Sequence, residues 1–443
     1  MNPVLAFVIV MLVWTVSDLV AKKTKSLLSS LFVASIIFFV GFLTDIFPED
    51  LLASSSLLAL AGVVVGFVIV HLGTMISLDD FKKQWKTLLV GIATVIGIGL
   101  ALLLAGFIFG PRITGSAADG YAQALDFVVA GTGALSGGTI SVLIVQEAAL
   151  GVGLTSIAVF PVLIAALQGL IGFPLTSIIL RREAARLKDE YRAGTLAPVV
   201  AAGAVAAGGG DGGVGDGGVG DGGVDDGGDG TGGADGGAGG ATPPAEPVPE
   251  TKLPAALRTT AGTLFIVGVV VLVSLGINNI TDGILNTFVV ALLFGIGLRT
   301  TGIFKPSVLS GIDAFGLMMI AIMILVFGPL ATVKPSDVSA LAVPLLIAFT
   351  FGIVGIAGSS ALVGKLLGYS VPMSVAIGLT SLYGFPGTMI LSQEAAKGAG
   401  ESPEEVAAIE NEILPKMIVA GFSTVTITSV IITSIIAGRI GGG

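Results

Sequence analysis

"GTGALSGGTISVLIVQEAA" spans Gly131 to Ala149, and "GLTSLYGFPGTMILSQEAA" spans Gly378 to Ala396. The two stretches align without gaps at an offset of 247 positions, and both end in Gln-Glu-Ala-Ala. Each one places a glycine-rich break inside an apolar segment. A broken apolar segment that occurs twice in one chain indicates an internal duplication.

The composition is typical of a membrane protein. The chain has 443 residues, of which 53% are hydrophobic and 12% are charged, and its mean hydropathy is +1.00. Many windows of about 18 or more residues carry almost no charge, which is long enough for a helix to cross the bilayer core. The lack of cysteine excludes disulfides and thiolate metal sites, and the single histidine excludes a multi-histidine centre. We therefore expect an all-α polytopic membrane protein without a resident metal or cofactor.

Glycine and aspartate dominate the segment between two hydrophobic halves. Its aspartates supply much of the net charge of −9, and it offers almost nothing to bury. Such a composition is typical of a disordered linker, and the acidity argues against nucleic acid as a partner. The predicted organisation is a first repeat over 1–190, a disordered linker over 191–251 and a second repeat over 252–443.

Each half contains six hydrophobic segments, and the fifth of each holds one quoted stretch, at about 121–150 and about 371–396. Basic residues follow the first, third and sixth segments of the first half, so these ends should face the cytoplasm. Six full crossings would put the last basic cluster, "RREAARLKDEYR" at 181–192, on the wrong side of the membrane. Five crossings satisfy the charge rule.

One segment of each half must therefore enter and leave the membrane on the same side, and the glycine-broken fifth segment is the natural candidate. The second half starts from the cytoplasm, so the same count gives it the opposite orientation. The chain is thus predicted to contain two inverted repeats, each with five transmembrane helices and one re-entrant hairpin. Both termini would lie outside the cell and the linker in the cytoplasm, in a multi-pass protein of the plasma membrane.

Two hairpins that enter from opposite faces would bring their tips together near the midplane. Helix starts at the tips would present N–H groups to an anion, and unwound carbonyl groups suit Na⁺. The alternative is that these small residues only allow close helix packing. The predicted substrate-binding residues are Ser136, Gly137, Gly138, Thr139, Gly384, Phe385, Pro386, Gly387 and Thr388.

Polar side chains near the hairpins are candidates for binding a coupling cation. A charged group within the hydrocarbon is costly and usually has a function, so each hairpin glutamate is a candidate cation ligand or proton carrier. The alternative for these groups is a position at the membrane interface, where a charge costs little. The predicted cation-coupling residues are Glu147, Glu394, Gln146, Gln393, Asp313 and Asp126.

The segment "ESPEEVAAIENEILPK" at 401–416 predicts an acidic surface helix capped by Ser402. We expect it to lie on the cytoplasmic face beside the second hairpin. A last membrane span would then begin at about residue 414.

The layout resembles that of the sodium/glutamate symporter family and of the related 2-hydroxycarboxylate (citrate-type) transporter family. Locally the resemblance rests on "SGGT" at Ser136–Thr139 and "GFPGT" at Gly384–Thr388, and in layout it covers nearly the whole chain. It implies two inverted halves of five spans, a glycine-rich re-entrant loop in each, and a cytoplasmic linker. It also implies secondary transport by a homodimer.

These observations predict a secondary transporter, coupled to Na⁺ or H⁺, for a small organic anion such as an amino acid or a carboxylate. The sequence contains no Walker motif, which argues against an ATP-driven pump. It contains no Ser/His/Asp set or His-x-x-x-His motif, so we do not expect an enzyme. The alternative is a monovalent cation/proton antiporter, for which Asp313 and Lys365 are the candidate midplane residues.

Overall fold

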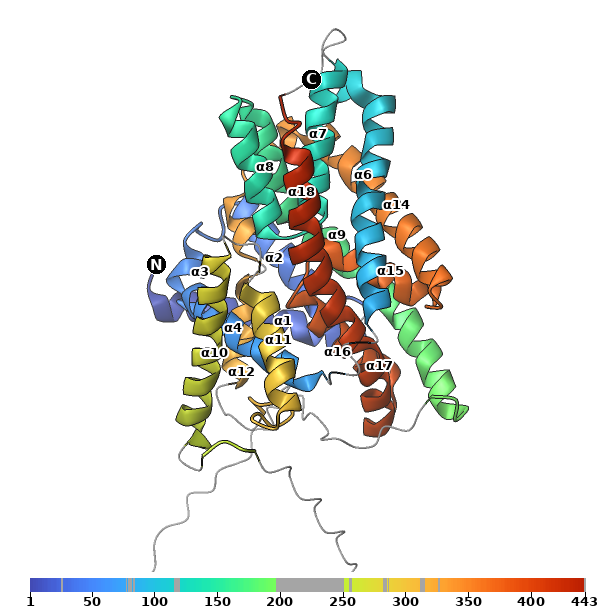
Figure 1. Ribbon diagram of the computed structural model, residues 1–443. Helices are drawn as coiled ribbons and strands as arrows, with labels where there is room; N and C mark the ends of the chain where they lie inside the picture. The colour runs from blue at the N-terminus through green and yellow to red at the C-terminus, as the bar shows by residue number, and fades with distance from the viewer. Residues whose placement is uncertain are drawn as a thin grey trace, which may run out of the picture.

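The protein is described by a computed structural model (Figure 1). It describes residues 1–24, 27–76, 78, 82, 84–114, 120–196, 251–254, 257–281, 285, 287–310, 315–325 and 327–441. Most of the predicted linker, 197–250, and the candidate Asp313 lie outside these residues. Every regular element among the described residues is helical, which confirms the all-α class.

Among the described residues, eight helices are long and apolar enough to cross a membrane. Large hydrophobic side chains remain exposed on their outer faces: Phe107 is 74% exposed and Leu346 is 69% exposed. Surfaces of this kind are stable in lipid, so the chain is a polytopic membrane protein. The eight are α1 (Pro3–Lys23), α4 (Leu57–Met75), α6 (Trp85–Thr114), α9 (Thr155–Arg192), α10 (Thr260–Ile280), α12 with η2 (Phe315–Leu325, Gly328–Thr332), α14 (Ala342–Leu366), and the continuous α17, η4 and α18 (Pro403–Phe422, Ser423–Thr428, Ser429–Ala437).

Two predicted spans are shorter than expected. The sequence predicts spans at 27–46 and 283–298, whereas α2 (Ser30–Leu43) and α11 (Thr287–Thr300) have 14 residues each. A helix of that length measures about 21 Å, less than the roughly 30 Å of a bilayer core. The second hydrophobic segment therefore forms a helix too short to cross the bilayer core in both halves of the chain. The remaining short helices outside the hairpins are α3 (Leu51–Ser54) and α13 (Pro335–Ala340).

The helices pack as two bodies, each built from both halves of the chain. The first body contains α1–α4, α10–α12 and η2, and the second contains α6–α9 and α14–α18 with η3 and η4. In Figure 1, α10 and α11 of the first body lie at the lower left, and α6 and α14 of the second body lie on the right. Contacts between the bodies are made mainly by α9, which touches α2 and η2.

Close backbone packing joins the two halves within the first body. A Cβ atom on Gly73 of α4 would lie 2.4 Å from the carbonyl oxygen of Leu292 on α11. A Cβ atom on Gly295 would lie 2.4 Å from the carbonyl oxygen of Val70. Only glycine permits helices to approach this closely, so these two positions fix α4 against α11.

The first hairpin consists of α7 (Gly120–Leu135) and α8 (Thr139–Gly151), which pack against each other. Its base is continuous with the start of α9, since only three residues separate α8 from Thr155. A straight helix of the 38 residues of α9 measures roughly 57 Å, so the two ends of α9 lie far apart even with two internal prolines. The first hairpin therefore belongs to the end of the molecule where α9 begins, which is the upper end in Figure 1.

The second hairpin consists of α15 (Val371–Leu379), η3 (Thr380–Leu382) and α16 (Gly387–Ala399). Its base lies beside the other end of α9. Ser370 Oγ donates a 2.6 Å hydrogen bond to Glu183 Oε2, and Lys188 Nζ lies 2.7 Å from Glu401 Oε1. The two hairpins thus approach the centre of the protein from opposite ends.

The predicted acidic surface helix at 401–416 is wrong as a separate element. Ser402 does cap a helix, because its side chain accepts the N–H of Glu405, but that helix continues to Phe422 and then through the π-helical segment η4 into α18. Its acidic first turn is held by α9: Arg192 Nε donates to Glu405 Oε1 at 2.6 Å. The paired charges allow one continuous helix to begin in water and run into the apolar interior.

Candidate functional site

The tips of the two hairpins touch at the centre of the second body. A Cβ atom on Gly137 would lie 2.3 Å from the carbonyl oxygen of Ser381. Val425, in the π-helical segment, completes the junction, because a Cβ atom on Gly138 would lie 2.3 Å from its carbonyl oxygen and one on Gly384 would lie 3.2 Å from its side chain. Both breaks and η4 therefore share one junction.

Glycine is required in these breaks for conformational as well as steric reasons. Gly137 and Gly138 have φ values of +83° and +88°, and Gly384 has a φ of +58°. Residues with a Cβ atom rarely adopt this left-handed region. The predicted glycine breaks at the two tips are thus where the chain reverses direction.

A cavity of about 470 Å³ lies at the seam between the two bodies and reaches both tips. This volume falls in the range of sites for small molecules. The first body contributes Ser35, Val65, Ile69, Phe288, Pro329 and Leu330 to its wall. The second body contributes Gly137, Gly138, Val142, Leu143, Gln146, Val162, Ala165, Ala166, Gln168, Gly169, Phe173, Leu382, Tyr383, Gly384, Phe385, Pro386, Gly421, Phe422 and Val425.

Most of the wall is apolar, and three polar side chains stand out on it. They are Ser35, Gln146 and Gln168. Within the described part of the chain, the buried Oε1 atom of Gln168 has no hydrogen-bond partner. A buried amide left in this way is destabilising unless a ligand or water pairs with it. The described residues of the wall include no charged side chain.

Two helix starts supply positive partial charge beside the cavity. Helix α8 begins after Gly138 and α16 begins after Pro386, and both capping residues line the cavity. No described side chain caps either start. The first N–H groups of an uncapped helix attract anions, but at α16 those of Thr388 and Met389 already donate to the carbonyl oxygens of Gly384 and Pro386. Each helix start still carries about +0.5 of an elementary charge.

The structure brings several predicted tip residues to the cavity and leaves others behind it. Gly137, Gly138, Gly384, Phe385 and Pro386 line the cavity. The ring of Phe385 stacks on Phe422, with centroids 5.6 Å apart. Behind this layer, Ser136 Oγ donates to the carbonyl oxygen of Gly133, Gly387 packs against Tyr383, and Thr388 Oγ1 is buried without a partner among the described residues. The side chain of Thr139 lies outside the described residues.

The predicted cation-coupling residues do not form one cluster. Gln146 lines the cavity, but its neighbour Glu147 is exposed. In the second hairpin, Gln393 Nε2 donates to Glu410 Oε1 at 3.2 Å, and Glu394 accepts hydrogen bonds from Ser30 of α2. The equivalent glutamates of the two hairpins therefore have different surroundings.

Asp126 lies away from the tips, near the base of the first hairpin. Its Oδ1 atom accepts the backbone N–H of Gly441 at 2.9 Å, so it holds the turn that follows α18. Lys365 is exposed in the last turn of α14. Neither residue reaches the cavity. No group of three or more His, Cys, Asp or Glu residues able to hold a metal occurs within the described ranges.

Several residues of the site are not among those predicted from the sequence. Gln168 and Phe173 belong to α9, and Tyr383 lies in the second break, where its hydroxyl donates to Thr176 Oγ1 at 3.0 Å. A glutamine inside an otherwise apolar segment was the available signal for Gln168. Val425 carries no signal, because its role depends on the π-helical turn.

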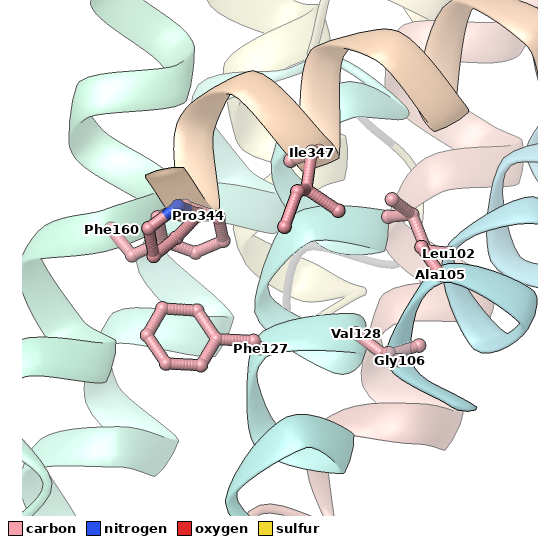
Figure 2. Close-up of a pocket in the computed structure, with 9 residues that line it drawn as sticks. Leu102, Ala105, Gly106, Phe127, Val128, Phe160, Pro344 and Ile347 are labelled. Atoms are coloured by element: carbon pink, nitrogen blue, oxygen red, sulfur yellow. The ribbon is translucent and has the colours of Figure 1, made fainter. Parts of the chain in front are cut away.

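A second cavity, between α6, α7, α9 and α14, has room for about 20 Å³ (Figure 2). Apolar side chains such as Leu102, Phe127, Phe160 and Ile347 surround it. A space of this size admits about one water molecule and offers it no polar partner on these side chains. It is a packing defect, and the cavity at the tips is the candidate site.

Comparison of this chain with protein-family models and with curated proteins gives no match.

Proposed function

We propose that this protein is a cation-coupled secondary transporter of a small organic anion. The observation that carries the proposal is the cavity at the seam between the two bodies, which both hairpin tips reach. Sites that open alternately to either side of a membrane are commonly built between two parts of a protein that move against each other. We infer that the second body carries the substrate past the first.

The interleaved arrangement supports an interpretation as two inverted repeats. Each half gives its first three segments to the first body and its last three to the second. The two hairpins have their bases at opposite ends of α9, which supports re-entrant insertion from opposite faces. In this topology both termini are outside, the linker is cytoplasmic, and the protein is a multi-pass protein of the plasma membrane. By the family resemblance, it works as a homodimer.

The walls of the cavity favour a molecule with one carboxylate and an apolar body. The starts of α8 and α16 together offer about one positive elementary charge, which matches one carboxylate. The Oε1 atom of Gln168, which has no partner among the described residues, can accept a hydrogen bond from an amino or hydroxyl group of the same molecule. Apolar side chains cover the rest of the wall. We therefore expect amino or hydroxy acids with a single free carboxylate to bind better than dicarboxylates and tricarboxylates.

Reconstitution into liposomes tests this proposal. Purified protein should drive uptake of a radiolabelled acid when a Na⁺ gradient or a pH gradient is imposed. The panel contains leucine, phenylalanine, lactate, glutamate, malate and citrate. Uptake of leucine, phenylalanine or lactate supports the proposed site if malate and citrate inhibit that uptake less than the other acids of the panel do. Failure of every acid to accumulate under either gradient would refute the function.

The same liposomes test the alternative, a monovalent cation/proton antiporter. Na⁺-driven proton release without uptake of any acid would favour it. The exposed position of Lys365 gives this alternative little support, because an antiporter needs the lysine at the midplane.

A further inference from the structure

Glu394 lies in the second hairpin at the seam between the two bodies. It belongs to α16, seven residues beyond the helix start at Gly387 and thus roughly 10 Å from the tip. Its carboxylate meets the first turn of α2, which belongs to the first body. Glu394 is therefore a polar link between the body that holds the tips and the body that faces it.

One carboxylate oxygen of Glu394 is fully engaged and the other is not. Oε1 accepts the backbone N–H of Ser30 at 3.0 Å and also accepts a hydrogen bond from Ser30 Oγ. These two donors at the start of a helix stabilise a negative charge. Oε2 is buried and has no hydrogen-bond partner among the described residues. It is the atom at which a proton can be added without breaking the existing contacts.

Few charged groups act on this carboxylate. Asp18 on α1 repels its negative charge, and Lys397 on α16 attracts it. On α17, Glu410 accepts a hydrogen bond from Gln393, the residue before Glu394 in the chain. No ion pair with Glu394 is present among the described residues, so its charge depends chiefly on the two donors of Ser30.

Movement of the second body would remove those donors. Apart from the hydroxyl of Ser35, the first body presents only apolar side chains along the same seam, such as Val65, Ile69 and Leu330, and these cannot pair with a charge. A carboxylate moved against such a surface would be strongly destabilised, whereas a protonated carboxyl group costs much less. The charge must therefore be neutralised before the two bodies separate at Ser30.

We propose that Glu394 is the proton-binding residue that couples movement of the two bodies to H⁺. The charged carboxylate holds α16 to the start of α2, and protonation at Oε2 weakens the two hydrogen bonds from Ser30 because they are no longer charge-assisted. The inference rests on the proposed transport function and deepens it, because it names H⁺ as the coupling ion. Glu147, the equivalent residue of the first hairpin, is exposed and serves as the matched control.

Cysteine labelling tests the proposal without knowledge of the substrate. The chain contains no cysteine, so Gln146→Cys places a single thiol on the cavity wall. N-ethylmaleimide labels this thiol in the full-length protein in liposomes at about pH 8, where an ordinary glutamate is ionised, and at about pH 5, which is close to the ordinary pKa of a glutamate. Glu394→Gln mimics the protonated residue in the same background. Glu147→Gln and Glu394→Asp are labelled in parallel. At each pH the labelling rate of a variant is divided by that of the parent, so that the effect of pH on the thiol itself cancels.

We expect the labelling rate of Glu394→Gln to differ at least about 3-fold from that of the parent at about pH 8 and to equal it at about pH 5. Glu394→Asp should keep the response to pH, and Glu147→Gln should behave like the parent. Equal rates for Glu394→Gln and the parent at both pH values would overturn the proposal, and so would an equal effect of Glu147→Gln. Uptake of no acid by the unsubstituted protein would refute the transport function separately, since the labelling result does not depend on uptake.

Discussion

Replacement of Gly137 by alanine would place a methyl group where the two hairpin tips touch. The added Cβ atom would lie 2.3 Å from the carbonyl oxygen of Ser381 and 2.8 Å from Cγ2 of Val425. Ordinary contact begins at 3.4 Å, so the tips must separate by the difference from 2.3 Å, which is about 1.1 Å. The φ of +83° adds about 1–2 kcal/mol of strain for a residue with a Cβ atom.

A shift of this size in a binding site commonly lowers its activity by about 10-fold to 100-fold. We expect at least a 10-fold loss in the initial rate of acid uptake into proteoliposomes, with a helical circular-dichroism spectrum like that of the parent. Gly151→Ala is the matched control, since it lies in the same hairpin and its added Cβ atom meets nothing within 4 Å. Parent-like uptake by Gly137→Ala would contradict the contact between the tips as the basis of the site.

Three other expectations follow from the packing, the cavity and the surface charges. Gly73→Ala should lower the free energy of unfolding by about 1–3 kcal/mol, because α4 cannot approach α11 as closely; thermal unfolding in detergent checks this, and an unchanged midpoint would contradict it. Gln168→Leu should raise the KM for the transported acid about 5-fold to 30-fold by removing its amide partner, whereas an unchanged KM would exclude contact with the substrate. Hydrogen bonds from Lys188, which has the larger effect, and from Arg192 lower the pKa of Glu401 from 4.5 to about 2. The ionised Glu401 therefore contributes its full stabilisation above pH 4.5, and this stabilisation is lost as the pH falls through about 2. Glu401→Gln should lower the melting temperature at about pH 7 and should lower it less at about pH 3.

The glycine pattern of the sequence was sufficient to predict the two breaks. Three glycines at the tips adopt positive φ values, and a Cβ atom on Gly137 or Gly138 would collide with backbone atoms. These requirements concern single residues, so the positions of the glycines in the sequence are enough to reveal them. The same pattern predicted the tip residues that line the cavity, which are Gly137, Gly138, Gly384, Phe385 and Pro386.

Helix ends were harder to predict, because polar caps and ion pairs decide them. Apolar residues continue on both sides of α2, but Ser29 accepts the N–H of Phe32 and starts the helix there. Helix α2 is shorter than predicted, whereas α17 is longer, because its acidic first turns predicted a separate surface helix. Arg192 and Lys188 neutralise that turn, and they are more than 200 positions away in the sequence.

Tertiary contacts decide the rest of the site. Gln168 becomes a wall residue only because α9 crosses the seam, and Glu394 contacts α2 only because the two bodies pack together. The repeat of Gln-Glu-Ala-Ala predicted equal roles for the two glutamates. Their surroundings differ, since Glu147 is exposed and Glu394 is bonded to Ser30.

The division of each half between two bodies has a consequence for biosynthesis. Helix α6 packs more extensively against α14 than against any other helix, and more than 200 residues separate the two in the chain. During synthesis, α6 therefore stays in the bilayer without its principal neighbour until the first four of the six segments of the second half have been inserted. Neither half can complete its own interior, so a protein truncated after the linker should be recognised as unassembled and degraded, and co-production of the missing half should rescue it.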